Sequence, residues 1–94
     1  MICAKYDPKT RTLTVEGHSR SAPKGEDLVC SAATILVMAL ADCVEERCAD
    51  KALSFRDGYA KIHGDDRAEA EFAFVLRGLK MLASVYPDHV TVAE

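Results

Sequence analysis

An apolar segment that runs from Leu28 to about Cys48 constrains the fold of this chain more than any other feature. It is rich in alanine, leucine, valine and methionine, and it has the length of a helix of about 20 residues. Because the segment is apolar on nearly every side until Asp42, one neighbour cannot cover it. We therefore expect either a sheet together with a second helix, or a second subunit, to pack against it.

Short alternating segments on both sides of this helix predict strands. Residues 1–7 and 12–18 alternate apolar and polar side chains around the turn sequence at 7–10, which indicates a hairpin. His18 is expected to end the second strand, on its polar face. Residues 52–55 and 59–63 flank Asp57-Gly58, a strong hairpin signal, and residues 89–93 alternate as a last strand.

A second helix is predicted between Asp65-Asp66 and Pro87. Its apolar side chains recur every three or four residues and form one stripe: Phe72, Val75, Leu76, Leu79, Leu82, Ala83 and Tyr86. The predicted order is β-β-α-β-β-α-β, a small two-layer α+β domain with two main helices on a mostly antiparallel sheet. No change of composition divides the chain, so residues 1–94 are interpreted as a single domain.

Composition argues against several classes of ligand. The 12 Lys and Arg residues are outnumbered by 15 Asp and Glu, and no three basic residues cluster, which argues against direct nucleic-acid binding. We find no signal peptide and no apolar run that approaches the roughly 20 residues of a membrane span. A cytoplasmic protein without a membrane contact is expected.

The four cysteines are expected to be free thiols, because a cytoplasmic compartment is reducing. Cys43 and Cys48 would lie about 140° apart around a helix, so they cannot share a metal ion. No metal and no cofactor are predicted. Cys3, in a strand, and Cys43, in the apolar helix, are interpreted as packed thiols.

Cys30 and His18 are the candidate catalytic residues. A free thiol has a pKa of about 8.5 and is only a few per cent ionised at neutral pH, so a cysteine nucleophile needs activation. Asp27 is placed to cap the apolar helix, which would put Cys30 in the first turn, near unpaired amides and the positive end of the helix dipole. A histidine at hydrogen-bond distance would take the thiol proton and later return it to the leaving amine.

His18 and Cys30 are separated by eleven residues, and within this gap residues 19–26 are polar and contain Pro23 and Gly25. A flexible loop of that length allows the two side chains to meet, but it does not require them to. In the alternative interpretation, Cys30 is a small buried hydrophobic residue and His18 lies on the surface. Spacing alone leaves both interpretations open.

Two motifs resemble the ribosomal-processing cysteine protease family known as Prp. They are Glu16-Gly17-His18 and Gly25-x-Asp27-Leu28-Val29-Cys30-Ser31-Ala32, which are similar to the family's Gly-His, loop and Gly-x-Asp-aliphatic-Val-Cys-Ala-Ala. The resemblance continues at Asp57-Gly58-Tyr59 and at Tyr86-Pro87-Asp88-x-Val90, so it spans nearly the whole chain.

The resemblance implies a homodimeric cysteine endopeptidase that removes a short N-terminal extension from a large-subunit ribosomal protein. It assigns catalysis to His18 and Cys30. It also implies a substrate loop that contains Ser19, Pro23 and Gly25 and orders over the substrate, with Gly25 as its hinge. A noncatalytic module that binds a ribosomal protein with the same fold is the alternative.

Three positions depart from the family pattern and affect the pocket rather than the dyad. Ser19 and Ser31 stand where alanine is common, and Thr34 stands where many members carry serine. Asp27 could orient His18 or cap the helix, and we favour the cap because it follows from local sequence. The amide of Cys30, together with a loop amide, is the expected oxyanion donor.

Overall fold

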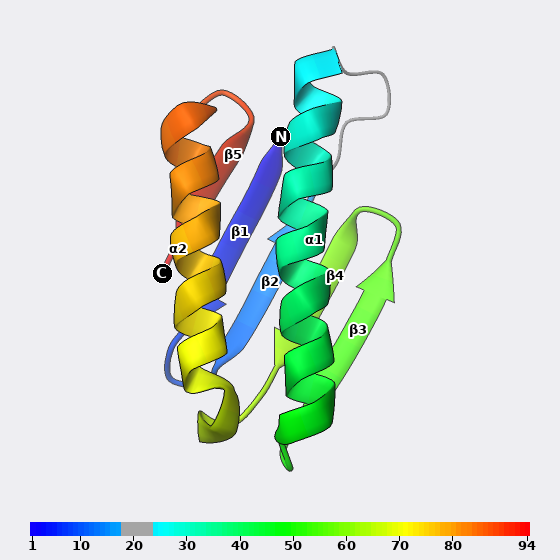
Figure 1. The fold of residues 1–94 in the computed structure, drawn as a ribbon, viewed down its shortest axis with the longest axis vertical. Helices are drawn as coiled ribbons and strands as arrows, with labels where there is room; N and C mark the ends of the chain where they lie inside the picture. The colour runs from blue at the N-terminus through cyan, green and yellow to red at the C-terminus, as the bar shows by residue number, and fades with distance from the viewer. Residues whose placement is uncertain (18–23) are drawn as a thin grey trace.

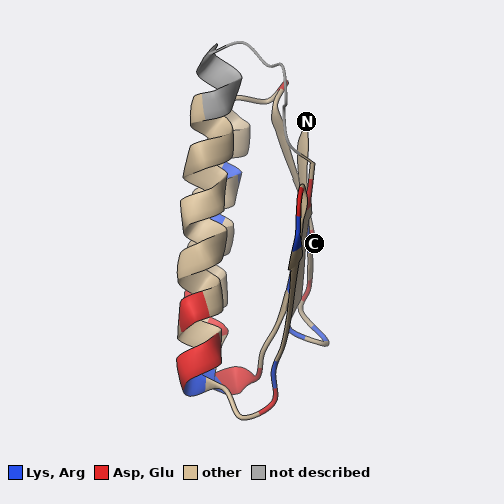
Figure 2. Ribbon diagram, turned by 90° about the vertical axis from the view of Figure 1, so that its right-hand side faces the viewer, with Lys and Arg blue, Asp and Glu red and all other residues tan. Residues whose placement is uncertain are grey.

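Both helices lie on one face of a single five-stranded sheet, which leaves the other face of the sheet uncovered by helices (Figures 1 and 2). The computed structural model describes residues 1–17 and 24–94, and within its first helix it describes side chains from Leu28 onward. The elements are β1 (Ile2–Asp7), β2 (Thr12–Glu16), α1 (Lys24–Arg47), β3 (Ala52–Arg56), β4 (Tyr59–His63), the 3₁₀ turn η1 (Asp66–Ala68), α2 (Glu69–Val85) and β5 (Val90–Ala93). The predicted α+β class and element order are confirmed.

The strand order in the sheet is β3-β4-β2-β1-β5. The β1–β2, β2–β4 and β3–β4 pairs are antiparallel, and β1 and β5 pair in parallel, with Ile2 opposite Val90. Each of the two hairpins is local in sequence, whereas the β2–β4 and β1–β5 pairs join distant segments. The free edges of the sheet are therefore β3 and β5.

The core lies between the sheet and the helices. Its largest fully buried side chains include Leu13 of β2, Ile62 of β4, Leu40 of α1, and Phe72 and Leu79 of α2. Burying a side chain of this size stabilises the fold by roughly 1.5–3 kcal/mol. The stripe predicted for α2 is the buried one at Phe72, Val75, Leu76 and Leu79, and Leu82, Ala83 and Tyr86 pack at its margin.

The first helix begins earlier than the sequence predicts. It starts at Lys24 and not after Asp27, so Asp27 is its fourth residue and the predicted N-cap is wrong. The acidic pair Glu26 and Asp27 then falls in the first turn, where negative charge is favoured by the helix dipole. The last three residues of the predicted loop over residues 19–26 are therefore helical, and residues 18–23 lie outside the described part of the chain.

One face of α1 is buried, and the opposite face is not. Val29, Ala33, Val37 and Leu40 pack into the core, while Leu28, Ile35 and Met38 are at least half exposed. The expectation that no apolar run reaches the length of a membrane span is also wrong, because Leu28–Arg47 is long and apolar enough by length and composition. In this fold, that segment packs on the sheet, as the core helix of a globular domain does.

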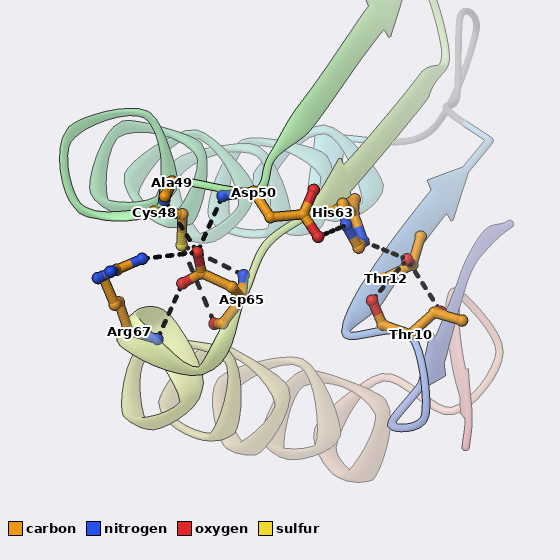
Figure 3. Close-up of polar contacts among 8 residues, drawn as sticks. All are labelled: Thr10, Thr12, Cys48, Ala49, Asp50, His63, Asp65 and Arg67. Atoms are coloured by element: carbon orange, nitrogen blue, oxygen red, sulfur yellow. Dashed lines mark hydrogen bonds and ion pairs between the residues drawn. The ribbon is translucent and has the colours of Figure 1, made fainter.

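A carboxylate joins the end of α1 to the start of the second helical segment. The side chain of Asp65 accepts hydrogen bonds from the backbone N–H groups of Ala49 and Asp50, both at 2.9 Å, and of Arg67 at 3.0 Å (Figure 3). The N–H of Asp65 itself donates to the buried sulfur of Cys48. Hydrogen bonds from Asp50, Arg67 and Ala49 lower the pKa of Asp65 well below its usual range.

The lowered pKa of Asp65 predicts a pH dependence of stability. A carboxylate whose pKa is depressed in the folded state adds stability above its unfolded pKa of about 3.9, and this stability is lost as the pH falls through the folded pKa. We expect thermal unfolding of Asp65→Asn to be less sensitive to pH than that of the parent between roughly pH 5 and pH 2. Asp66→Asn, which removes the same charge from the next residue, is the control. Equal slopes in the parent and in Asp65→Asn would contradict the prediction.

Candidate active site

A cleft of about 310 Å³ lies between α1 and the β3–β4 hairpin. Cys30, Thr34 and Met38 follow one another at intervals of four residues along α1, so they form one flank of the cleft. Residues 55–60 of the hairpin form the other flank, and the floor consists of Ile2, Val15, Ala33 and Val37. The site is open on one side and largely apolar at its base.

Cys30 is the predicted nucleophile, and the structure places it in this cleft as a half-buried free thiol. It packs at the margin of the core. The hydroxyl of Thr34, predicted as a supporting residue, donates to the Cys30 carbonyl oxygen at 2.7 Å. Thr34 therefore bonds to the backbone of Cys30, and it also lines the cleft.

The early start of α1 changes the surroundings of Cys30. Cys30 is the seventh residue of the helix, and only the first four amides of a helix lack a partner within it. The Cys30 amide therefore donates its hydrogen bond within the helix. It is not free to act as the oxyanion donor that the sequence predicted. The influence of the helix dipole also weakens beyond the first turn.

Gly17 brings the chain to the same cleft from the opposite side. Its N–H donates to the carbonyl of Gly58 at the tip of the β3–β4 hairpin, at 2.9 Å, and its φ angle is +102°. A Cβ atom at this position would lie 2.0 Å from the carbonyl oxygen of Met1. Only glycine suits this position, because both its conformation and its space exclude a side chain.

His18 follows Gly17 directly but lies outside the described residues, as do Ser19 and Pro23. The strand predicted to include His18 ends at Glu16. Gly17, the residue before His18 in the sequence, lines the cleft together with Cys30. The Cys–His pair itself stays a prediction.

The other two predicted residues both lie in the first turn of α1. Gly25 is the second residue of the helix. The prediction that it is the hinge of a loop is therefore wrong. Asp27 is helical and does not occupy the cap position. Its side chain is outside the described part of the structure, so an interaction with His18 stays a prediction.

Several cleft residues had not been singled out by the sequence. Phe55 and Met38 stand on opposite flanks with about half of each side chain exposed, and the guanidinium of Arg56 lies 3.8 Å from the centre of the Tyr59 ring. Such stacking holds the Arg56 cation at the rim of the cleft. The hairpin signal at Asp57-Gly58 predicted this turn, but only the β2–β4 pairing brings it next to Gly17.

A second polar cluster lies near the other end of the hairpin. His63 Nδ1 is 3.1 Å from the hydroxyl of Thr12, and its Nε2 is 3.3 Å from the Asp50 carboxylate (Figure 3). These groups do not line the cleft. Among residues 1–17 and 24–94, no three His, Cys, Asp or Glu side chains are grouped so that they could hold a metal ion.

Comparisons with known proteins agree with this fold. A family model described as Cysteine protease Prp matches residues 1–91. The essential ribosomal processing protease Prp of S. aureus, solved in complex with a substrate peptide, superposes with a TM-score of 0.78 at 15% identity, covering 99% of this chain and 97% of that one. SMU.848 from Streptococcus mutans gives a TM-score of 0.71 at 21% identity, covering 99% and 93%. A search of curated protein sequences finds no match.

Proposed function

The chain belongs to the cysteine protease Prp family, and on this premise we propose that it is an endopeptidase that removes a short N-terminal extension from a large-subunit ribosomal protein. Cys30 is the nucleophile and His18 the general base. One observation carries the proposal: Cys30 lines a cleft that is also lined by Gly17, the residue before His18. We propose a ribosomal substrate because the S. aureus structural relative is a ribosomal processing protease.

The reaction proceeds in two steps at Cys30. His18 takes the thiol proton, the sulfur attacks the scissile carbonyl, and the proton passes to the leaving amine as the amide bond breaks. Water, deprotonated by His18, then hydrolyses the thioester and releases the extension with a new carboxylate. The proton returns to the sulfur, so the enzyme ends in its starting state.

The cleft suits an extended, largely apolar segment of peptide. Its floor of Val15, Ala33 and Val37 offers no charge, and Phe55 and Met38 stand exposed at its opening. Covering apolar surface of this kind is favourable by about 25 cal/mol per Å². We propose that the segment before α1, which contains Ser19 and Pro23, closes over the bound peptide. We also propose that the reaction takes place in the cytoplasm, where ribosomal proteins are made.

The test is cleavage of a synthetic peptide that spans the predicted N-terminal junction of the ribosomal protein. Mass spectrometry of the products gives the scissile bond directly. A single cut that releases the extension is the expected result. A folded protein that leaves the peptide intact, at an enzyme concentration of tens of micromolar over hours, would contradict the proposal.

The noncatalytic module keeps one observation in its favour, the interior position of the Cys30 amide. Thiol reactivity separates the two functions. A cysteine paired with a histidine reacts as a thiolate at neutral pH, so we expect iodoacetamide to modify Cys30 first at pH 7. Cys3 should follow. It is exposed, so the expectation that it is a packed thiol is wrong. Cys48 should be last, because burial raises its pKa and leaves it 5% exposed.

Peptide mapping of an alkylation time course checks this order. Cys30 is expected to react at least about tenfold faster than Cys3, although Cys3 is the more exposed of the two. Equal, slow rates at both thiols would favour the noncatalytic module.

We further propose a homodimer, formed through the outer face of the helix layer. The exposed apolar side chains of this face are Leu28 and Ile35 of α1 and Phe74, Met81 and Val85 of α2. In Figure 2 the charged residues of the described part of α1 gather at its C-terminal end, and residues 28–41 carry no charge. A second copy with the same apolar face is the occupant that complements it.

The dimer predicts a doubled mass in light scattering at micromolar concentration. Ile35→Glu is expected to raise the dimer dissociation constant by roughly 30-fold or more, the effect of losing an interface residue worth about 2 kcal/mol. Lys61→Glu, an exposed change on β4, is the control. A monomer mass for the parent would exclude this dimer.

A further inference from the structure

Strand β3 presents an unpaired edge beside the cleft. It is an outermost strand of the sheet, and in Figure 1 it lies on the side of α1 that faces away from α2. Its five residues, Ala52–Arg56, pair one to one with β4 without a bulge and without proline. Bulges and prolines are among the features that keep edge strands from pairing with other chains, and β3 has neither.

The register determines which backbone groups are free. Arg56 and Tyr59 flank the two-residue turn at Asp57-Gly58, so they exchange both of their hydrogen bonds. In an antiparallel pair this pattern alternates, so Ser54 and Ala52 also bond to β4, whereas the N–H and C=O groups of Leu53 and Phe55 point away from it. Among the described residues, no other backbone hydrogen bond involves Leu53 or Phe55.

The side chains of these two residues face the helix layer. Leu53 lies opposite Ile62 and Phe55 opposite Ala60, and Ile62 is fully buried beneath the helices. Phe55 lines the Cys30 cleft and is 46% exposed, and Met38, across the opening, is 51% exposed. The free edge of β3 is therefore continuous with the cleft through Phe55.

We propose that the substrate binds as an added sixth strand along β3. Its backbone pairs with the N–H and C=O groups of Leu53 and Phe55, an established mode of peptide recognition at free sheet edges. Its side chains opposite those two residues then lie on the helix-facing side, where apolar ones cover Phe55 and Met38. This inference rests on the proposed function, because it assigns the substrate's binding mode at the same site.

Amide hydrogen exchange tests the pairing directly. The Cys30→Ala variant is saturated with the synthetic junction peptide, and exchange at single amides is followed by NMR. We expect the Leu53 and Phe55 amides to exchange at least about tenfold more slowly with the peptide bound. The Ser54 amide, which already bonds within the hairpin, and the amides of the far edge strand β5 should be unchanged.

Cleavage of the same peptide by the parent separates failure of this inference from failure of the proposed function. If the parent cleaves the peptide but the exchange rates of the Leu53 and Phe55 amides do not change on peptide binding, the added strand is excluded. The proposed protease function would then still stand. If these amides are already protected without peptide, a second copy covers the edge and the proposal is wrong. If the parent does not cleave and the variant does not bind, both proposals fail.

A proline substitution provides an independent measurement. Leu53→Pro removes the outward N–H, which the β3–β4 pairing does not use, so the hairpin is retained. We expect it to lower kcat/KM for the junction peptide about tenfold, while Ser54→Ala, a change on the opposite face of the same strand, stays within about twofold of the parent. Single N-methyl groups along the peptide should lower kcat/KM at every second residue of the paired segment. The absence of this alternation with the parent enzyme would overturn the proposal even if Leu53→Pro did not fold.

Discussion

Cys30→Ala is expected to abolish cleavage of the junction peptide, with a loss of roughly 10³-fold or more in kcat/KM. The variant removes the atom that forms the covalent bond to the substrate, and neither the cleft nor His18 can replace it. The measurement is product formation by mass spectrometry at matched concentrations of folded protein. The fold itself should change little, because Cys30 packs only at the margin of the core.

The matched control is Cys43→Ala, which removes a half-buried thiol from the same helix away from the cleft. It should retain cleavage within about twofold of the parent. Full activity of Cys30→Ala would exclude Cys30 as the nucleophile. Loss of activity in both variants would indicate damage to α1 rather than loss of a reacting group.

Gly17→Ala is expected to destabilise the protein by about 2 kcal/mol or more. A non-glycine residue at a φ angle of +102° is strained by roughly 1–3 kcal/mol, and the new Cβ atom would lie 2.0 Å from the Met1 carbonyl oxygen. The clash involves backbone on both sides, so it is relieved only by moving β2 or the first residue. In a domain of this size, 2 kcal/mol corresponds to a fall of about 8–16 °C in Tm.

Cleavage should fall with stability in this variant, because any shift of Gly17 moves the start of the segment that carries His18. We expect kcat/KM to drop by about tenfold at a temperature where the variant is folded. Gly78→Ala is the control, since its Cβ would meet only the flexible end of Leu36, at 3.0 Å, and should change stability by less than about 1 kcal/mol. Equal Tm values for the two variants would contradict the role given to Gly17.

Local patterns predicted the elements of this fold well, because each of these signals depends on neighbours in sequence. Alternation marked the strands that bury Leu13 and Ile62, and a three-four spacing marked the helix that buries Phe72 and Leu79. The strand order depends on the pairing of β2 with β4 and of β1 with β5, which no local pattern specifies. The cleft is a product of that order, so the partners of Cys30 on the hairpin could not be predicted.

The start of α1 illustrates a different limit. Pro23 and Gly25 are both typical of loops, and they favoured a late helix start with Asp27 as the cap. Proline also suits the beginning of a helix, and Glu26 and Asp27 suit its first turn, so the same residues are compatible with a helix that begins at Lys24. The oxyanion donor was misassigned for this reason alone, because its position was counted from the predicted cap.

The parallel pairing of β1 with β5 has a consequence for synthesis on the ribosome. Ile2 lies opposite Val90, and the N–H of Ile2 donates to the carbonyl of His89. Strand β1 is therefore paired on both sides only after residues 89–93 have been synthesised. Contacts this distant in sequence form late. Because Ile2 also forms part of the cleft floor, the cleft is complete only after residues 89–93 have left the exit tunnel. A nascent chain therefore carries Cys30 well before it carries the complete cleft.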